Sequence, residues 1–469
     1  MFLFRLFQAV ILFTLIVIPT FLMGGTLPVL CSAMISNEPT FTKLTGYLYG
    51  LNTLGAMAGV LLSGFFTIGI FGELNTMYIG VVINLLAGTV VLILARKRQL
   101  IKTPDATLEI SQKGSKTKPE TISVFPEPTR KFIVAAYAVV GFCTLALEVV
   151  WIRIFQLPLG TAIYAFSAVL TIYLGGSALG SYVFGKHFTQ IKSPVETAAL
   201  AILFIGLWGI AGLHFFSAAV PWQVDPNIIF DVSDIYVPLL IIFPITFLLG
   251  FIFPLVTKIY VSKAQEAGVK IGKLYSLNTL GCILGSFSAG YILIPVFGTR
   301  TTIIIISLVN ILLGFILLSY EKKLFTTRIK MVIRFACIGL AFILIAKSTD
   351  PYISVVNKYI ETFNSRELKI KHHKETSTAT VTALVSSVEP LGKHLLINGV
   401  GVTCICPETK LMAHFPILLH TNPKEMLIIC YGMGTCLRSA VSHTNMQIDQ
   451  VELVGEEYKI NNVYYPDGK

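Results

Sequence analysis

Ten apolar runs occupy the first three quarters of this 469-residue chain, and only the last is short for a membrane span. A helix needs about 20 residues to cross roughly 30 Å of hydrocarbon. In lipid, only a helix or a closed barrel satisfies its own backbone hydrogen bonds. We therefore predict a polytopic α-helical membrane domain over residues 1–347, with spans near 7–30, 46–70, 76–95, 132–151, 161–184, 196–218, 236–257, 273–297, 300–319 and 331–346.

Composition supports the same class of protein. Charged residues make up 13% of the chain, whereas a soluble domain has roughly 25%. The formal net charge is +11, but the Lys and Arg residues fall in the connections between apolar runs. We interpret this basicity as a signature of topology and of contact with the anionic lipid bilayer. It does not indicate nucleic-acid binding.

An internal repeat relates residues 24–96 to residues 250–322 at a constant offset of 226. The segment GYLYGLNTLGAMAGVLLSGFFTIGIFG matches IGKLYSLNTLGCILGSFSAGYILIPVFG, without a gap over the shared register. Such repeats are common in two-lobed transport bundles, so we predict an internally duplicated, major-facilitator-like bundle. The first copy lacks counterparts of the runs at 132–218. We expect either a naturally short lobe or a true start upstream of Met1.

Small residues within the repeat predict close helix packing. Gly55 and Gly59 form one GxxxG pair and Gly281 and Gly285 form another, and this spacing lets two helix backbones approach closely. We expect both pairs to lie in helix–helix contacts.

Four polar residues in or next to the apolar runs are candidates for helix contacts or for ligand binding. For Asn52 and Asn278, at equivalent repeat positions, we expect hydrogen bonds between helices, with solute binding as the alternative. Glu148 and Arg153, in the stretch ALEVVWIRIF, predict an interfacial ion pair. Alternatively, Glu148 is an intramembrane ligand for an ion or substrate.

The positive-inside rule predicts the topology. The connections at 96–131, 186–192, 258–273 and 321–334 are basic and alternate correctly, whereas 219–235 has three aspartates and no Lys or Arg. A multi-pass protein of the inner cell membrane follows. If 331–346 spans, the C-terminal segment lies outside the cytoplasm. Because that run is short and carries Arg334, an interfacial or re-entrant helix is the alternative.

The soluble segment follows a linker that we place at 348–375. From 376, β-branched residues and the turn signals PLGK and NG indicate a small β-meander, and LMAHFPILLH indicates a helix. The stretch KEMLIICYGMGTCLRSAVSHTNMQIDQVELV then reads as strand, glycine turn, helix and strand. We therefore predict an incomplete α/β, Rossmann-like domain at the end of 376–469.

The glycine turn is the candidate nucleoside site. Gly432 and Gly434 allow a tight turn and close approach of the backbone to a ligand, and Thr435, at the start of the next helix, is a further candidate for binding that ligand. Glu452, at the tip of the second strand, can accept hydrogen bonds from two ribose hydroxyls. The alternative is an α/β unit without a ligand. The only CxC pair, Cys404 and Cys406, has no second pair, so we expect no metal site.

The stretch GKHLLINGVGVTCICPETKLMAHFPILLHTNPKEMLIICYGMGTCLRSA resembles the opening of the spermidine synthase (polyamine aminopropyltransferase) family. That family has a β-meander with a DG turn, then HxPLLxHPxPKxVLIIGGGDG and a strand ending in Glu. The residues His414, Pro416, His420, Pro423 and Lys424 fit this frame. GGTLP, the two LNTLG motifs and ALEVVW resemble the bacterial branch in which a multi-span membrane domain precedes the synthase.

The resemblance implies aminopropyl transfer from decarboxylated S-adenosylmethionine to a diamine. It implies that Gly432, Gly434 and Glu452 bind the nucleoside and that the region of Glu408 and His414 meets the substrate. Three family acids are replaced: Met433 and Val454 stand where the family has Asp, and Lys410 where it has Glu.

The family's proton-accepting Asp is expected beyond Lys469, so we expect a truncated chain without catalytic activity. A transporter of a polyamine or related solute, with a nucleoside-binding C-terminal sensor, is the first rival. An S-adenosylmethionine-dependent methyltransferase and an inactive fragment are the others.

Overall fold

The computed structural model describes residues 2–34, 41–101, 125–159, 163–188, 190–219, 235–262, 266–321, 325–362, 368–388, 392–444 and 446–465. These residues form two compact units. Unit 1 contains 1–134, 166–194 and 246–275, and unit 2 contains 135–165, 195–245 and 276–469. Residues 102–124 of the basic connection, residues 220–234 of the acidic connection and the first half of the PLGK turn lie outside the described residues.

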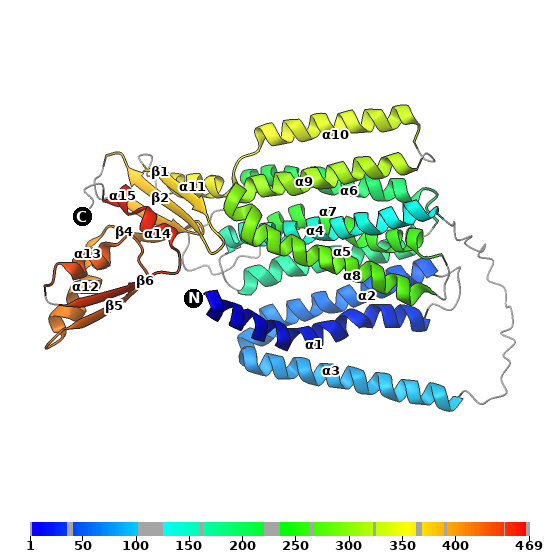
Figure 1. Ribbon diagram of the computed structural model, residues 1–469, viewed down its shortest axis with the longest axis horizontal. Helices are drawn as coiled ribbons and strands as arrows, with labels where there is room; N and C mark the ends of the chain where they lie inside the picture. The colour runs from blue at the N-terminus through cyan, green and yellow to red at the C-terminus, as the bar shows by residue number, and fades with distance from the viewer. Residues whose placement is uncertain are drawn as a thin grey trace. The chain divides into compact units, whose positions relative to one another are not determined.

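Long apolar helices dominate the first 350 residues (Figure 1). They are α1 (Phe2–Met34), α2 (Phe41–Leu62), α3 (Ile68–Ile101), α4 (Glu127–Leu159), α5 (Ile163–His187), α6 (Pro194–Ala219), α7 (Tyr236–Tyr260), α8 (Ala267–Ser288), α9 (Ile294–Tyr320) and α10 (Thr327–Lys347). Among the described residues, eight helical stretches have the length and composition to cross a membrane. The predicted polytopic helical class is therefore confirmed at this level.

Two of these eight stretches are too long to be single spans. They cover 55 residues at Thr42–Arg96 and 54 residues at Ala267–Tyr320, and a straight helix of that length reaches about 80 Å. Each is broken by a glycine with left-handed backbone angles: Gly72 has φ 76° and ψ 170°, and Gly298 has φ 77° and ψ 168°. Counting each broken stretch as two spans accounts for the ten predicted apolar runs.

The two breaks belong to a series of features that recur at the offset of the sequence repeat. A π-helical turn joins α2 to α3 at Ser63–Thr67 (η2), and another joins α8 to α9 at Ala289–Leu293 (η5). The second π-helical turn begins 226 residues after the first, and Gly298 likewise follows Gly72 by 226 residues. Equivalent sequence positions therefore adopt the same irregular backbone.

The two GxxxG pairs behave differently. A Cβ atom on Gly281 or Gly285 would overlap the carbonyl oxygen of Ala138 or Phe142 on α4, so this predicted helix contact is confirmed. Around Gly55 and Gly59 the described residues leave open space. The expected contact of the first pair is therefore absent from the described structure.

The C-terminal part of unit 2 holds a four-stranded antiparallel sheet in the order β1 (Leu368–Glu375), β2 (Thr380–Ser386), β3 (Lys393–Ile397) and β4 (Val400–Cys404). The predicted NG turn joins β3 to β4, with positive φ at both Asn398 and Gly399, as a type I′ turn requires. The segment predicted to be a linker instead contains α11 (Pro351–Thr362) and β1. Asp350 caps α11 by accepting from the N–H groups of Tyr352 and Ile353.

The sheet has two buried faces because successive strand residues point to opposite sides. Val356 of α11 packs with Leu384 and Leu396 on one face. Val381 and Leu395 pack on the other face with residues that follow β4. The meander is therefore held between α11 and the last segment of the chain.

That last segment contains α12 (Pro407–Leu419), β5 (Glu425–Ile429), α13 (Thr435–Val441), β6 (Gln447–Val451), α14 (Glu456–Lys459) and α15 (Asn461–Tyr464). Strands β5 and β6 pair in parallel, with Leu427 opposite Asp449. Ala413 of α12 and Ala440 of α13 pack together with Ile428 of β5. The predicted succession of strand, glycine turn, helix and strand is thus observed as a two-stranded parallel unit.

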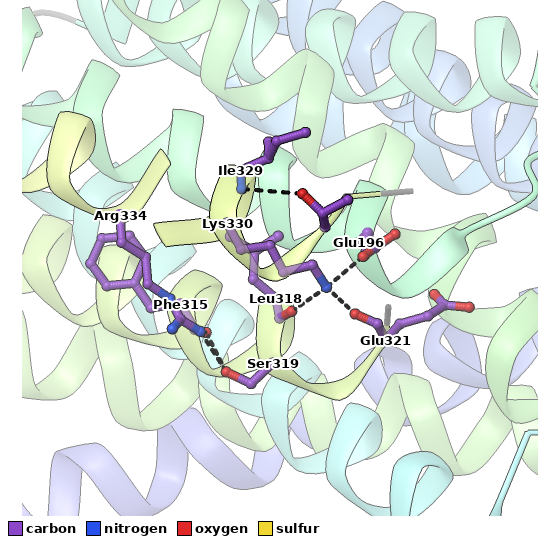
Figure 2. Close-up of polar contacts among 9 residues, drawn as sticks. Glu196, Phe315, Leu318, Ser319, Glu321, Ile329, Lys330 and Arg334 are labelled. Atoms are coloured by element: carbon purple, nitrogen blue, oxygen red, sulfur yellow. Dashed lines mark hydrogen bonds and ion pairs between the residues drawn. The ribbon is translucent and has the colours of Figure 1, made fainter. Parts of the chain in front are cut away.

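A buried cation fastens the start of α10 to α6 and α9 (Figure 2). The Lys330 ammonium lies 2.5 Å from the carboxylate of Glu196 and donates to the backbone carbonyls of Leu318 and Glu321. One turn later, Arg334 donates to the carbonyl of Phe315 at 3.0 Å. Lys330 thus binds carbonyls at the C-terminal end of α9, where a helix leaves its last carbonyls without an intrahelical partner, and Arg334 binds a carbonyl one turn earlier.

The other end of α10 is fastened to the opposite ends of the same two helices. The carbonyl of Leu344 is 2.8 Å from Nε2 of His214, near the end of α6, and Arg300, near the start of α9, donates to the carbonyl of Ile345. Helix α10 therefore runs the full length of α6 and α9. This geometry favours a span over an interfacial or re-entrant helix for 331–346.

A spanning α10 places the sheet at the end of unit 2 opposite Lys330. The connection after α9 is the basic one, with Lys322, Lys323 and Arg328, and the positive-inside rule assigns it to the cytoplasm. We therefore expect the sheet on the extracytoplasmic side.

This topology predicts which cysteines a membrane-impermeant maleimide reaches. In a chain whose only remaining cysteine is the exposed Cys430, we expect labelling in intact spheroplasts. As the matched control, a cysteine at the exposed position 328 (Arg328→Cys, without Cys430) should react only after permeabilisation. The reverse pattern would place the sheet in the cytoplasm and reject the assignment.

The Glu196–Lys330 pair predicts an asymmetric effect of mutation. Lys330→Met removes the cation that lies 2.5 Å from the fully buried carboxylate of Glu196, so we expect a loss of about 3–5 kcal/mol in the free energy of unfolding. Adding Glu196→Leu should restore most of it, and Arg328→Met, at an exposed position of the same helix, should change little. Denaturation in detergent measures all three, and equal losses in the single and double variants would contradict the prediction.

Candidate functional site

The loop between β5 and α13 has a left-handed backbone at every second residue. Cys430, Gly432 and Gly434 have φ values of 73°, 58° and 75°. Residues with a Cβ atom rarely adopt this region, so Cys430 is strained. At Gly434 a Cβ atom would also lie 2.6 Å from the hydroxyl of Tyr431. The predicted glycines are therefore required by the path of the loop.

Two carboxylates close onto this loop. Glu452 accepts hydrogen bonds from the N–H groups of Tyr431 at 2.6 Å and Val454 at 2.7 Å. Glu457 accepts from the N–H group of Gly432 at 2.9 Å. Burial, followed by the charge of Glu452, raises the pKa of Glu457 to about 7. The loop thus has a pair of acids on it, of which the sequence predicted only Glu452.

Residues after β6 cover the other side of the loop. The hydroxyl of Thr435 lies 2.9 Å from that of Tyr465, and Met433 is buried with Ile460 and Tyr464. Thr435, predicted to bind a ligand, is itself buried. The Thr435 side chain therefore links α13 to Tyr465, directly after α15.

The two predicted substrate residues, Glu408 and His414, lie on α12 and take no part in the hydrogen bonds of Glu452 and Glu457. Glu408 is exposed in the first turn, and a hydrogen bond from its own backbone N–H lowers the pKa of its carboxyl. His414 is half-buried, with Nδ1 2.9 Å from Nε2 of His443. No interaction among the described residues connects either side chain with Glu452 or Glu457.

A cavity of about 470 Å³ lies at the opposite end of the parallel unit. Its lining includes Pro416 of α12, Lys424 and Glu425 at the start of β5, and Met446 before β6. Ligands of parallel sheets bind beyond the C-terminal ends of the strands. We therefore do not associate this cavity with the glycine loop.

Arg153 does not form the ion pair predicted with Glu148. Its guanidinium donates to the hydroxyl of Tyr352, the carbonyl of Thr376 and the hydroxyl of Thr380. Neighbours on one helix face are three or four residues apart, whereas these two residues are five apart. Arg153 thus connects α4 to α11 and the β1–β2 turn, and Glu148 remains half-buried on another face of α4.

The predicted interhelical hydrogen bonds of Asn52 and Asn278 are also absent from the described structure. Nδ2 of Asn278 is 3.7 Å from Sγ of Cys282, one turn along its own helix. A Cβ atom on Gly141 of α4 would lie 2.5 Å from Oδ1 of Asn278, so this side chain sits in a packed seam. Asn52 is exposed.

A second polar cluster, which the sequence did not predict, lies on the face of the sheet toward α11. A register shift in β1 between Ile370 and His372 brings His373 and Glu375 to this face, and bulges commonly re-aim side chains in this way. Atoms of His373, Glu375 and Asp350 that could bind a metal lie within 4.8 Å of one another. We call these three residues the Asp350 cluster.

Glu375 also joins the sheet to the broken helix α9. It accepts from the N–H group of Thr299 at 2.8 Å and from the hydroxyl of Thr299. Thr299 directly follows Gly298, where the helix is interrupted, so Glu375 caps the restarted helix. Burial raises the pKa of the Glu375 carboxyl, and the Thr299 hydrogen bonds oppose that rise.

Some of these contacts have a local signal in the sequence and others have none. The pair Asp350-Pro351 is a helix-start signal that could have revealed α11. Glu375 and Glu457 carry no local signal, because their partners lie 76 and 25 residues away.

Comparisons with protein families, curated proteins and solved structures gave no match.

The raised pKa of Glu457 predicts how stability changes with pH. An unfolded glutamate titrates near pH 4.3, so the folded state binds this proton more tightly. The resulting stabilisation is complete below about pH 4 and is lost as the pH rises through about 7. We expect the Tm of the detergent-solubilised chain to fall more steeply between about pH 5 and pH 7.5 than that of Glu457→Gln.

The neutral amide of Glu457→Gln keeps an acceptor for Gly432 but has no proton to lose. Glu425→Gln, which changes an exposed carboxyl, should retain the wild-type pH slope. Identical slopes in the wild type and Glu457→Gln would refute the assignment.

Proposed function

We propose that this chain is a membrane-bound protein of the spermidine synthase type. In this proposal, the β5–α13–β6 unit binds an adenosyl nucleoside, and the reaction class is aminopropyl transfer to a diamine. The internally duplicated bundle and the incomplete Rossmann-like unit are parts of the same proposal.

One observation carries it. The residues of the loop with left-handed backbone angles are Cys430, Gly432 and Gly434. With Met433 at the Asp of the family's GGGDG motif, these three residues stand where the motif has its first, third and last glycine. The loop backbone has a positive φ at all three positions, including the position where Cys430 stands in place of the family's glycine. Agreement at every second residue supports common ancestry of the loop more strongly than a lone GxG motif does.

The acid pair supports nucleoside binding at the same loop. Glu452 follows β6 and is half-buried beside the loop, which is where a ribose-binding carboxylate is placed in nucleotide folds. Glu457 shares the site with it. For a ribose to bind, its hydroxyls would replace the N–H groups of Tyr431 and Val454 as partners of Glu452.

The chemistry implied by the family is a nucleophilic substitution. A neutral amine of the diamine attacks the carbon beside the sulfonium of decarboxylated S-adenosylmethionine. The carbon–sulfur bond breaks, 5′-methylthioadenosine leaves, and a base takes the proton from the new ammonium. Lys410 and Met433 stand where the family has acidic residues. We therefore assign nucleoside recognition to the described residues, and we assign the role of catalytic base to none of them.

Transport is the second candidate, and the topology of unit 2 favours it. Adenosyl nucleosides are made inside cells, whereas the positive-inside rule places the sheet outside. A duplicated bundle carrying an extracytoplasmic binding domain suits movement of a polyamine or related solute. The packed position of Asn278 gives no support to a solute path there. Labelling of Cys430, described above, separates the two candidates.

The nucleoside site predicts binding of 5′-methylthioadenosine to the detergent-solubilised chain. Glu452→Gln removes the charged acceptor for the ribose, and a hydrogen bond to a charged group contributes about 1.5–3 kcal/mol. We therefore expect at least a tenfold higher Kd by titration calorimetry. Glu425→Gln is the matched control, with an exposed carboxyl on the neighbouring strand, and should bind like the wild type.

Two outcomes would overturn the proposal: no heat of binding for the wild type at millimolar nucleoside, or equal affinities for the wild type and Glu452→Gln. Competition by S-adenosylmethionine but not by its decarboxylated form would instead indicate the methyltransferase.

A further inference from the structure

We propose that the Asp350 cluster binds a divalent transition-metal cation, and the ligand set fits Zn²⁺. Asp350, His373 and Glu375 present candidate ligand atoms within 4.8 Å of one another. Carboxylate oxygens and imidazole nitrogens both bind Zn²⁺, and zinc sites with three protein ligands leave a further position for another ligand. The site is separate from the glycine loop and independent of the proposed function.

Each side chain has binding capacity left for an ion. Asp350 uses Oδ1 for both of its helix-capping hydrogen bonds, which leaves Oδ2. The two oxygens of Glu375 each take one hydrogen bond from Thr299, while a carboxylate offers about four lone-pair sites. The cap and the helix restart thus hold both carboxylates in position without exhausting them.

His373 provides an observation that points directly to a ligand. Its Nδ1 lies 2.9 Å from the hydroxyl of Thr382, whereas its Nε2 is buried and has no hydrogen-bond partner among the described residues. A buried ring nitrogen without a partner is costly. Metal-binding histidines characteristically use one nitrogen for the metal and donate the other N–H to an oxygen, and Thr382 provides that oxygen.

Charge favours the same conclusion. The nearby cation, Arg153, is already engaged by Tyr352, Thr376 and Thr380. Two carboxylates beside one guanidinium leave negative charge for a metal to balance.

The distances and the imidazole narrow the choice of ion. In a tetrahedral Zn²⁺ site with bonds of about 2.1 Å, two ligand atoms lie about 3.4 Å apart, so we expect the side chains of the cluster to move closer together when the ion binds. Mg²⁺ and Ca²⁺ prefer all-oxygen sites, whereas imidazole suits Zn²⁺ and related transition metals.

The test measures zinc content and thermal stability of the detergent-solubilised full chain. After treatment with a chelator and incubation with Zn²⁺, we expect one zinc per chain by mass spectrometry and a higher Tm than in chelator. Asp350→Asn keeps an amide that can cap α11 but loses the charged ligand. It and His373→Gln should lose the bound zinc and the rise in Tm, while their Tm in chelator stays near the wild-type value.

His414→Gln is the matched control, because the close pair formed by His414 and His443 is another place where zinc could collect. This variant should keep its zinc and its rise in Tm. The proposal is overturned if the wild type binds no zinc, if Asp350→Asn binds as much as the wild type, or if zinc is lost in His414→Gln. If the three side chains form only a hydrogen-bonded cluster, the wild type will bind no zinc.

Discussion

Hydrogen bonds from Thr299 to Glu375 are the interaction on which the arrangement of unit 2 depends. Gly298 breaks α9 and leaves the first N–H group of the restarted helix without an intrahelical acceptor. In a low-dielectric setting this group must find a partner. The last residue of β1 supplies it, so the requirement created by a broken helix also positions the sheet. Arg153 and the cap of α11 reinforce that junction from two other helices.

Local patterns predicted the elements of this chain better than their contacts. Apolar runs gave the helices, NG gave the β3–β4 turn, and the glycine loop gave β5, α13 and β6, because each depends on residues close together in sequence. The partners of Arg153 lie about 200 or more residues away, beyond the reach of periodicity. The predicted ion pair between Arg153 and Glu148 was wrong because residues five apart do not face each other on a helix.

The candidate site follows the same division. Gly432, Gly434 and Glu452 were predictable from their spacing, and the structure brings them together. Glu457 was missed because it is reached only after a turn beyond β6 that no motif marks. The Asp350 cluster depends on a bulge, and a strict two-residue alternation would have turned His372 and Lys374, not His373 and Glu375, toward α11.

The fastening of α10 at both ends has a mechanical consequence. Fourteen residues separate Lys330 from Leu344, or about 21 Å of helix, and each end is tied to the same two neighbours. A helix held in this way cannot tilt alone when the bilayer becomes thinner or thicker, so hydrophobic mismatch must be accommodated by α6, α9 and α10 together. Because Glu375 ties the sheet to α9, we expect a change in membrane thickness to change the angle at which the sheet faces the bilayer.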